Sequence, residues 1–344
     1  MFLLRSVTAG DAKDLFELSK TMLFINLPPD EEIIKKKIKH SVRSFKKHGG
    51  KFEDNYYIFV LEDLKTKKVI GVSMIHAQHG TETEPHFFLK VGQEHKFSKS
   101  LNTGFIHGTL KLGYDQNGPT EIGGLVLLPE FRNNPNKLGR QLSFVRFLYM
   151  AIYPEFFKEE IHSELMPPLD KEGNSPLWEA IGRRFLNMNY HEADFLSRSN
   201  KEFILSLYPS DTIYTTLLPI EARDAISKVG ESSKPVKKML EKIGFTHNNE
   251  VDPFDGGPHY RCKLKNITLV KNKLSGLLDK KSPYIATEAE EILLTLKIDK
   301  YDFSAIQTLA NIKKVNGETK VILPPETYEI FKINDNLETD FILL

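Results

Sequence analysis

The 344-residue chain has little of several features that mark whole classes of protein. It contains one cysteine, Cys262, so neither an intrachain disulfide nor a cysteine-rich metal site can form. It has no apolar run near the 18 residues of a membrane span, and the apolar run at its N-terminus is too short for a signal peptide. Its 47 basic and 46 acidic side chains nearly cancel, which argues against dominant attraction to nucleic acid or to a membrane surface. We therefore expect a cytoplasmic protein with neither partner.

What is present is an ordinary globular composition, 40% hydrophobic and 27% charged, in a chain long enough for two domains. Apolar patterning predicts strands at 2–7, 56–61, 69–75 and 121–128, and helices that begin at Asp11, Asp30 and Gln141. Residues 76–118 show no regular pattern and are expected to form an insertion. Short helices and strands are expected from 154 to 262. A more charged tail carries expected strands at 321–323 and 341–343 around a helix at 325–331.

A strand, a polar loop and a helix follow one another between residues 121 and 153. The free N–H groups at a helix N-terminus suit a diphosphate, and small residues let the main chain approach it. The arrangement resembles the acyl-CoA loop of GNAT-type N-acyltransferases, and this resemblance implies that the residues in contact with an acyl-CoA are Leu125, Val126, Leu127, Arg132, Gly139 and Arg140. The loop alone fits an ordinary connection equally well, because an isolated glycine motif is unspecific.

The segment 163–185 contains the only tryptophan of the chain. Ser175 and Pro176 have the residue types of a helix N-cap and first helical position. Helical spacing then predicts one inner face that contains Trp178, Ile181 and Phe185.

Together these segments resemble the arginine N-succinyltransferases, a family of GNAT-type acyl-CoA N-acyltransferases. The resemblance covers residues 1 to 262 and rests on segments 59–63, 125–129 with Arg132, 146–148, 163–185, 193–196, 213–215, 240–245 and 254–258. It implies an α/β, GNAT-like acyltransferase fold with a mixed, mostly antiparallel sheet flanked by helices. The implied organisation is a GNAT-like half at 1–153 with the acyl-CoA loop, a second α/β half at 154–262 with the amino-acid site, and a small β-containing appendage at 263–344.

The resemblance also implies a reaction, transfer of a succinyl group from succinyl-CoA to the α-amino group of L-arginine, with no metal. Carboxylates are needed to bind the guanidinium group of such a substrate. The expected catalytic residues are Glu164 and Tyr214, and the expected substrate-binding residues are Arg184, Asp194 and Asp255. Each has a structural alternative, such as a cap for Glu164 or a turn for Asp255. The sequence spacing of His162, His191, His247 and His259 is not that of a metal site.

One position departs from the family pattern. The histidine that the resemblance implies as proton donor falls on Gly230, which has no side chain to donate a proton. Two alternatives therefore stay open beside arginine succinylation. One is N-acyl transfer with a different acyl-CoA or amine, and the other is a catalytically silent subunit that binds CoA or pairs with an active partner. A homo-oligomer or a hetero-oligomer fits the resemblance.

Overall fold

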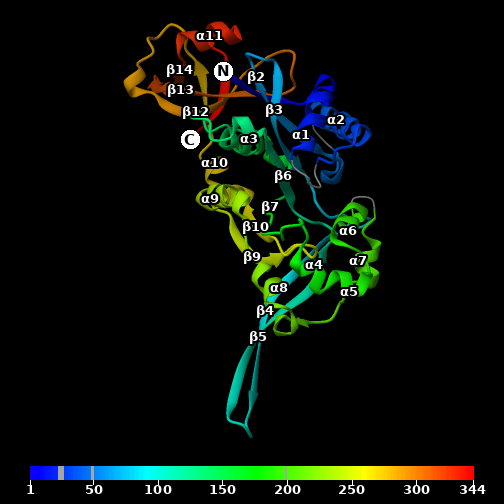
Figure 1. The fold of residues 1–344 in the computed structure, drawn as a ribbon. Coiled ribbons are helices and arrows are strands. Elements are labelled where there is room, and N and C mark those ends of the chain that lie inside the picture. Colours follow the sequence, from blue (N-terminus) through cyan, green and yellow to red (C-terminus); the bar gives the residue numbers. More distant parts are fainter. Residues whose placement is uncertain (22–26, 48–49, 198–199) are drawn as a thin grey trace. The chain divides into compact units, whose positions relative to one another are not determined.

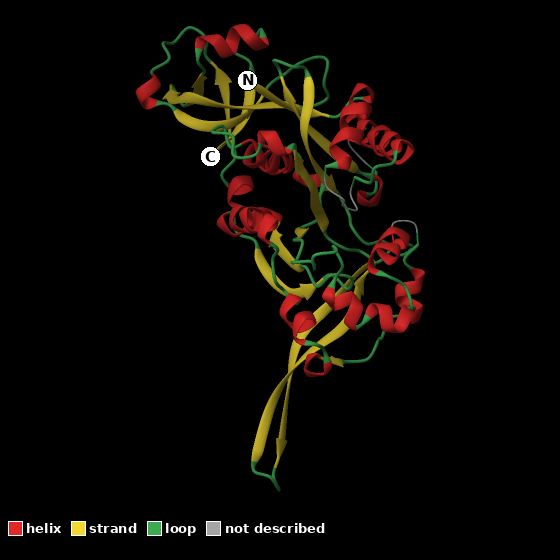
Figure 2. Ribbon diagram, in the orientation of Figure 1, coloured by secondary structure: helices red, strands yellow, loops and turns green. Residues whose placement is uncertain are grey.

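The computed structural model describes residues 1–21, 27–47, 50–197 and 200–344 (Figures 1 and 2). The chain forms two compact units: unit 1 is Met1–Ala77, Ile122–Glu159 and Leu264–Leu344, and unit 2 is Gln78–Glu121 and Glu160–Lys263. Within the described ranges, no helix has both the length and the apolar character needed to cross a membrane.

Unit 1 is a sheet with helices packed on it. Its elements are β1 (Phe2–Ser6), α1 (Ala12–Lys20), α2 (Glu31–Lys46), β2 (Tyr56–Asp63), β3 (Lys68–His76), most of β6 (Thr120–Leu127), α3 (Leu138–Ile152), α10 (Thr268–Lys271), β11 (Leu274–Leu278), β12 (Glu290–Thr295), β13 (Ser304–Val315), β14 (Glu318–Ile322), α11 (Pro325–Phe331) and β15 (Glu338–Leu343). The strand order is β12-β15-β11-β14-β13-β1-β2-β3-β6.

Local sequence signals explain the helices and the hairpin of unit 1. The Asp30 carboxylate accepts hydrogen bonds from the main-chain N–H groups of Glu32 and Ile33, at 2.9 and 3.0 Å, and so caps α2 as predicted. The expected hairpin is β2 with β3, and every residue of β2 is buried. A strand of continuous apolar character is thus central in the sheet, as its pattern indicates.

The C-terminal residues form strands and a helix where the sequence predicts them, but they do not form a separate appendage. β12 pairs with both β15 and β13, which closes β12, β15, β11, β14 and β13 into a ring without a free edge. β13 then continues into the unit 1 sheet, because Leu4 of β1 lies opposite Ala305.

Unit 2 contains a second antiparallel arrangement. Its elements are β4 (His86–Ser98), β5 (Thr103–Asp115), the first residues of β6, β7 (Glu160–Glu164), α4 (Pro176–Ala180), α5 (Gly182–Leu186), α6 (Tyr190–Ser197), α7 (Glu202–Leu207), β8 (Ile213–Tyr214), α8 (Ile220–Ala225), α9 (Lys234–Lys242), β9 (Thr246–Val251) and β10 (Pro258–Lys263). The order is β6-β7-β10-β9-β4-β5-β8. The expected insertion is largely the long β4–β5 hairpin, whose tip extends away from the rest of unit 2 (Figure 1).

The core of unit 2 is built around Trp178. The Ser175 hydroxyl accepts a hydrogen bond from the Trp178 N–H, so the predicted helix start is confirmed. Trp178 and Ile181 are buried, but Phe185 is 58% exposed, so the prediction that it continues their face is wrong. The helix breaks at Ile181 (φ −122°, ψ −75°), and α5 begins at Gly182. A Cβ at Gly182 would lie 2.3 Å from the Trp178 ring, so the close packing at the start of α5 requires glycine.

The two compact units do not follow the predicted divisions after residues 153 and 262. Residues 264–344 group with the N-terminal residues because β13 pairs with β1. Residues 78–121 group with unit 2 because β4 pairs with β9, with Leu89 opposite Val251. Long-range strand pairing, which local patterns do not contain, decides both assignments.

Candidate active site

The segment predicted to bind acyl-CoA lies in unit 1. Leu125, Val126 and Leu127 are on β6, and a short 3₁₀ turn follows the strand. The Arg132 Nε donates to the Leu127 carbonyl at 3.2 Å, so this arginine folds back on the end of the strand. A Cβ at Gly139, in the first turn of α3, would meet no atom within 4 Å. The main chain at this helix start is therefore accessible to a ligand.

β6 contains a glycine pair, Gly123 and Gly124. Gly124 has a φ of +57°, and a Cβ there would lie 2.5 Å from the Met74 sulfur, so the position requires glycine. The preceding Gly123 carbonyl accepts a hydrogen bond of 3.1 Å from Nη1 of the buried Arg146 on α3. A positive φ inside a strand turns the neighbouring peptide groups out of the regular ladder, as in a β-bulge.

Arg140 has a different environment from the one predicted. Its Nη2 lies 2.5 Å from a carboxylate oxygen of Glu291 on β12, and Gln307 donates to the same carboxylate at 2.6 Å. The guanidinium therefore joins α3 to the C-terminal strands of unit 1. Its predicted contact with acyl-CoA stays a prediction.

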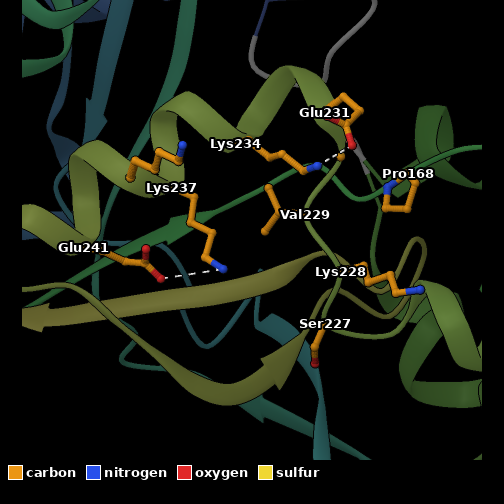
Figure 3. A pocket seen from close by; sticks show the side chains of 10 residues that line it. Pro168, Ser227, Lys228, Val229, Glu231, Lys234, Lys237 and Glu241 are labelled. Carbon is orange, nitrogen blue, oxygen red and sulfur yellow. Dashed lines mark hydrogen bonds and ion pairs between the residues drawn. The ribbon is translucent and has the colours of Figure 1, made fainter.

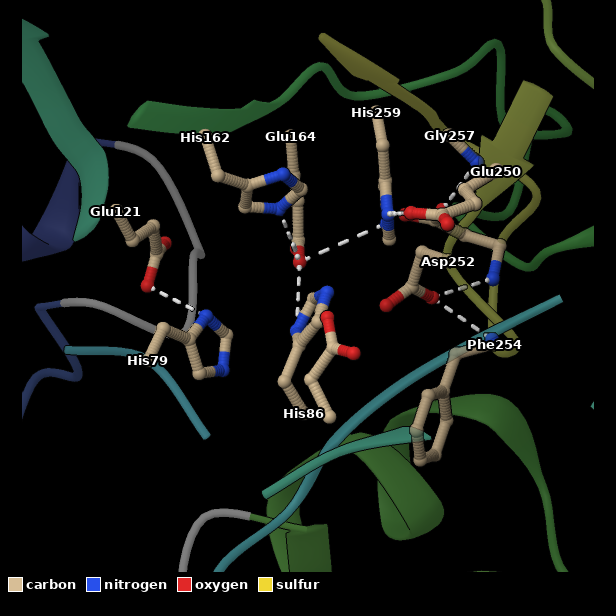
Figure 4. Close-up of polar contacts among 12 residues, drawn as sticks. His79, His86, Glu121, His162, Glu164, Glu250, Asp252, Phe254, Gly257 and His259 are labelled. Atoms are coloured by element: carbon tan, nitrogen blue, oxygen red, sulfur yellow. Dashed lines mark hydrogen bonds and ion pairs between the residues drawn. The ribbon is translucent and has the colours of Figure 1, made fainter. Parts of the chain in front are cut away.

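In unit 2, four side chains from three strands converge on one point (Figure 4). They are His86 on β4, His162 and Glu164 on β7, and His259 on β10. Glu164 Oε1 lies 3.7 Å from His86 Nδ1, 3.2 Å from His162 Nε2 and 3.6 Å from His259 Nε2. The three histidines are 0–1% exposed. We call these four residues the histidine cluster.

The electrostatics of the histidine cluster follow from this burial. Burial holds the pKa of His86 well below its usual value and lowers that of His162 to about 4. For Glu164 burial opposes ionisation, but the hydrogen bond from His162 and the neighbouring His259 outweigh it and lower the carboxyl pKa to about 2. At neutral pH the ionised Glu164 carboxylate therefore faces the neutral imidazoles of His86 and His162.

An acidic turn joins β9 to β10 and lies beside the cluster (Figure 4). Asp252 Oδ1 accepts from the N–H groups of Phe254 and Asp255, and Asp255 Oδ1 accepts from Gly257. Burial, with added repulsion from Glu164, raises the pKa of Asp252 to about 7. Burial and the charge of Asp252 raise the pKa of Asp255 well above its usual value. Across the described ranges, the structure gives neither aspartate a lysine or arginine partner.

The other predicted site residues are not all brought to this place. Asp194 on α6 is near enough for its charge to add to the raised pKa of Asp255. Arg184 is exposed on α5. The Tyr214 hydroxyl donates to Glu94, which is eight residues along β4 from His86, or roughly 27 Å at about 3.4 Å per residue. The structure therefore does not place Tyr214 beside Glu164.

Gly230 lines a cavity of about 530 Å³ in unit 2 (Figure 3). The other lining residues are Pro168, Ser227, Lys228, Val229, Glu231, Lys234, Lys237, Lys238 and Glu241. The Gly230 N–H donates to the Met166 carbonyl at 2.8 Å, and a Cβ at Gly230 would lie 2.8 Å from the Pro167 carbonyl oxygen. Main chain thus fills the space that a side chain would need.

We expect Gly230→Ala to lower the free energy of unfolding by about 1–3 kcal/mol, because the new methyl group meets rigid main chain. Urea unfolding followed by circular dichroism measures this. Gly139→Ala is the matched control, since its methyl group enters open space and favours the helix. Equal stability of the two variants would contradict the close approach at Gly230.

Sequence reasoning missed His86 and Asp252 and judged the histidines by sequence spacing alone. One local signal was available. Residues at i and i+2 of a strand share a face, so His162 and Glu164 had to point the same way. The approach of His259 depends on the β7–β10 register, in which His259 lies opposite Glu164.

Comparison with known proteins agrees with the resemblance seen in the sequence. The family described as "Arginine N-succinyltransferase beta subunit" matches residues 2–269. An arginine N-succinyltransferase of Escherichia coli O6:K15:H31 (strain 536 / UPEC) is 35% identical over 274 residues, 79% of this chain and 78% of that protein. One of Shigella dysenteriae serotype 1 (strain Sd197) has the same identity and coverage.

Among solved structures, the arginine/ornithine succinyltransferase subunit AI from Pseudomonas aeruginosa covers 100% of this chain and 98% of its own, with a TM-score of 0.82 and 25% identity. The likeness extends over the C-terminal strands and confirms the predicted fold class, a mixed α/β GNAT-like acyltransferase fold. On the family match and the identity to these relatives, the chain belongs to the arginine N-succinyltransferase family of acyl-CoA-dependent N-acyltransferases.

Proposed function

We propose that this protein transfers the succinyl group of succinyl-CoA to the α-amino group of L-arginine. Family membership supports the reaction class. The observation that carries the choice of arginine is the acidic turn, where the half-buried Asp252 and Asp255 lie close together, with raised carboxyl pKa values and no lysine or arginine ion-pair partner within the described ranges.

A guanidinium ion is the natural ligand for such a pair. Its planar donors match carboxylate oxygens, and a bound cation would replace the repulsion that raises both carboxyl pKa values. Asp194 adds a third negative charge near Asp255. Acidic side chains in a buried setting bind a cation more strongly than exposed ones do, because less water screens the charges.

The acyl-CoA side of the proposal rests on unit 1. The open main chain around Gly139 at the start of α3 suits the diphosphate of CoA. Peptide groups turned out of the β6 ladder at Gly124 supply N–H donors for the thioester carbonyl oxygen, where negative charge develops during attack. The side chain of Arg132 holds the end of the strand in place.

In this reaction the neutral α-amine forms a bond to the thioester carbon, the C–S bond breaks, and the thiolate of CoA takes a proton. An α-amino group has an appreciable neutral fraction at mildly alkaline pH, so attack does not depend on a strong base. We do not assign a proton-transfer role to Tyr214, which is bonded to Glu94, or to Glu164, whose oxygen faces three histidine nitrogens.

Release of the CoA thiol from succinyl-CoA tests the proposal on the purified chain, with and without L-arginine. Arginine-dependent release is the expected result, and it should scale with protein concentration. If CoA release occurs only with another amine or another acyl-CoA, the protein is an N-acyltransferase with different substrates. No release, together with a CoA-dependent rise in melting temperature, would favour a silent subunit. Either of the last two results would overturn the proposal.

A further inference from the structure

The histidine cluster has features that neither acyl transfer nor arginine binding requires. One ligand-type atom from each of the four residues lies within 4.8 Å of all the others. His259 is completely buried, and its Nε2, which faces Glu164, has no hydrogen-bond partner among the residues that the structure describes. Buried polar atoms are almost always satisfied, so an orphaned nitrogen aimed at a carboxylate calls for a missing partner.

The distances from Glu164 to the three histidine nitrogens fit those between neighbouring ligands of a tetrahedral ion. Imidazole nitrogens and carboxylate oxygens bind Zn²⁺ at about 2.0–2.2 Å, which places neighbouring ligands of a tetrahedron about 3.4 Å apart. The three distances from Glu164 Oε1 to the histidine nitrogens are 3.2, 3.6 and 3.7 Å. An ordinary hydrogen-bonded cluster would not need all three nitrogens at this separation from a single oxygen.

The surroundings of the cluster also suit a metal. Three of the ligands are on the neighbouring strands β7 and β10, whose register fixes His259 opposite Glu164 and so holds the site rigid before any ion binds. The second nitrogen of His259, Nδ1, lies 3.9 Å from a carboxylate oxygen of Glu250. This separation is longer than a hydrogen bond. On metal binding, a shift of Glu250 to hydrogen-bond distance would orient the ring and increase its basicity.

We propose that His86, His162, Glu164 and His259 bind a divalent transition metal ion, with Zn²⁺ as the ion best matched to three imidazoles and a carboxylate. Four protein ligands complete a tetrahedral shell, so the ion is structural and ties β4 to β7 and β10 inside unit 2. The proposal is independent of the acyl-transfer reaction, because the site lies on strands that hold unit 2 together.

The test uses the full chain, stripped with a chelator and then titrated with ZnCl₂ and, separately, with CoCl₂. We expect one Zn²⁺ per chain by calorimetry, a higher melting temperature with zinc, and the visible absorption of tetrahedral Co²⁺. Loss of an outer-shell partner weakens metal binding about 10- to 100-fold, so loss of a ligand should weaken it by at least about 100-fold. Glu164→Gln and His259→Gln are the variants for this measurement.

His191→Gln is the matched control, since His191 is an exposed histidine in unit 2 outside the cluster, and we expect wild-type affinity. Circular dichroism of the metal-free variants checks that they fold. If His259→Gln does not fold, Glu164→Gln still tests the proposal, because it preserves the size of a partly exposed side chain. Binding at less than one site per chain, an octahedral Co²⁺ spectrum, or unchanged affinity in Glu164→Gln would overturn the proposal. Failure of arginine-dependent CoA release would not overturn the metal proposal, because metal binding is measured without the enzymatic activity.

Discussion

Replacing Asp255 with asparagine is expected to raise the KM for L-arginine about 10- to 150-fold and to leave the KM for succinyl-CoA unchanged. A hydrogen bond to a charged group is worth about 1.5–3 kcal/mol, which sets this range. Asparagine keeps the oxygen that accepts from the Gly257 N–H, so the turn survives and only the charge is lost. Steady-state kinetics with each substrate varied in turn measures the effect.

The same variant should be more stable than the wild type at alkaline pH. The pKa of Asp255 is raised in the folded state, and that of Asp252 is raised to about 7, so folding favours their protonated forms. Their favourable contribution is complete below the unfolded pKa near 3.8 and is lost as the pH rises through the folded pKa. We therefore expect Asp255→Asn to be more stable than the wild type at pH 8 and to differ little from it at pH 4, as measured by urea unfolding.

Arginine binding is expected to depend on pH in the opposite direction from stability, and to weaken as the pH falls. Because the carboxylates bind the guanidinium only when ionised, the KM for L-arginine should rise as the pH falls through 7, where Asp252 becomes protonated. Asp224→Asn is the matched control, since Asp224 is exposed and 3.9 Å from Lys228, and it should alter neither KM nor stability. An unchanged KM for arginine in both Asp252→Asn and Asp255→Asn would refute the assignment of the acidic turn.

Trp178→Ala is expected to lower the free energy of unfolding by about 3–5 kcal/mol, the usual cost of removing a large buried aromatic side chain. Trp178 is 1% exposed and stacks on Phe254, with ring centroids 4.9 Å apart and planes at 5°. Its Nε1 also donates to the Met188 carbonyl at 2.9 Å. Urea unfolding followed by circular dichroism gives the loss directly.

Removal of the Trp178 ring should also disturb the proposed arginine site, because its stacking partner Phe254 lies in the acidic turn between Asp252 and Asp255. We therefore expect Trp178→Ala to raise the KM for arginine as well. Trp178→Phe keeps a ring to stack on Phe254 and should lie between the wild type and the alanine variant. Phe185→Ala, on the exposed side of α5, should change stability by no more than about 0.5 kcal/mol. A small effect of Trp178→Ala would show that the core of unit 2 does not depend on this stack.

The agreement between sequence and structure is greatest where short-range chemistry decides the outcome. The Asp30 cap of α2, the Ser175 cap of α4 and the helix over 325–331 all formed as predicted, because capping side chains and prolines act on main chain a few residues away. The resemblance likewise identified the family from segments in order along the chain. The face predicted for Phe185 is wrong because the helix breaks at Ile181 and helical spacing does not continue across the break.

The sequence by itself thus determined several strands and helices, the caps at Asp30 and Ser175, and the family. Tertiary structure alone decided that residues 264–344 complete the sheet of unit 1, that the acidic turn with Asp252 and Asp255 lies beside the histidine cluster, and that His86 meets His162 and His259. The physical reason is that strand register sets these contacts. Hydrogen bonds between strands far apart in sequence fix which side chains face each other, and no pattern within a single segment carries that information.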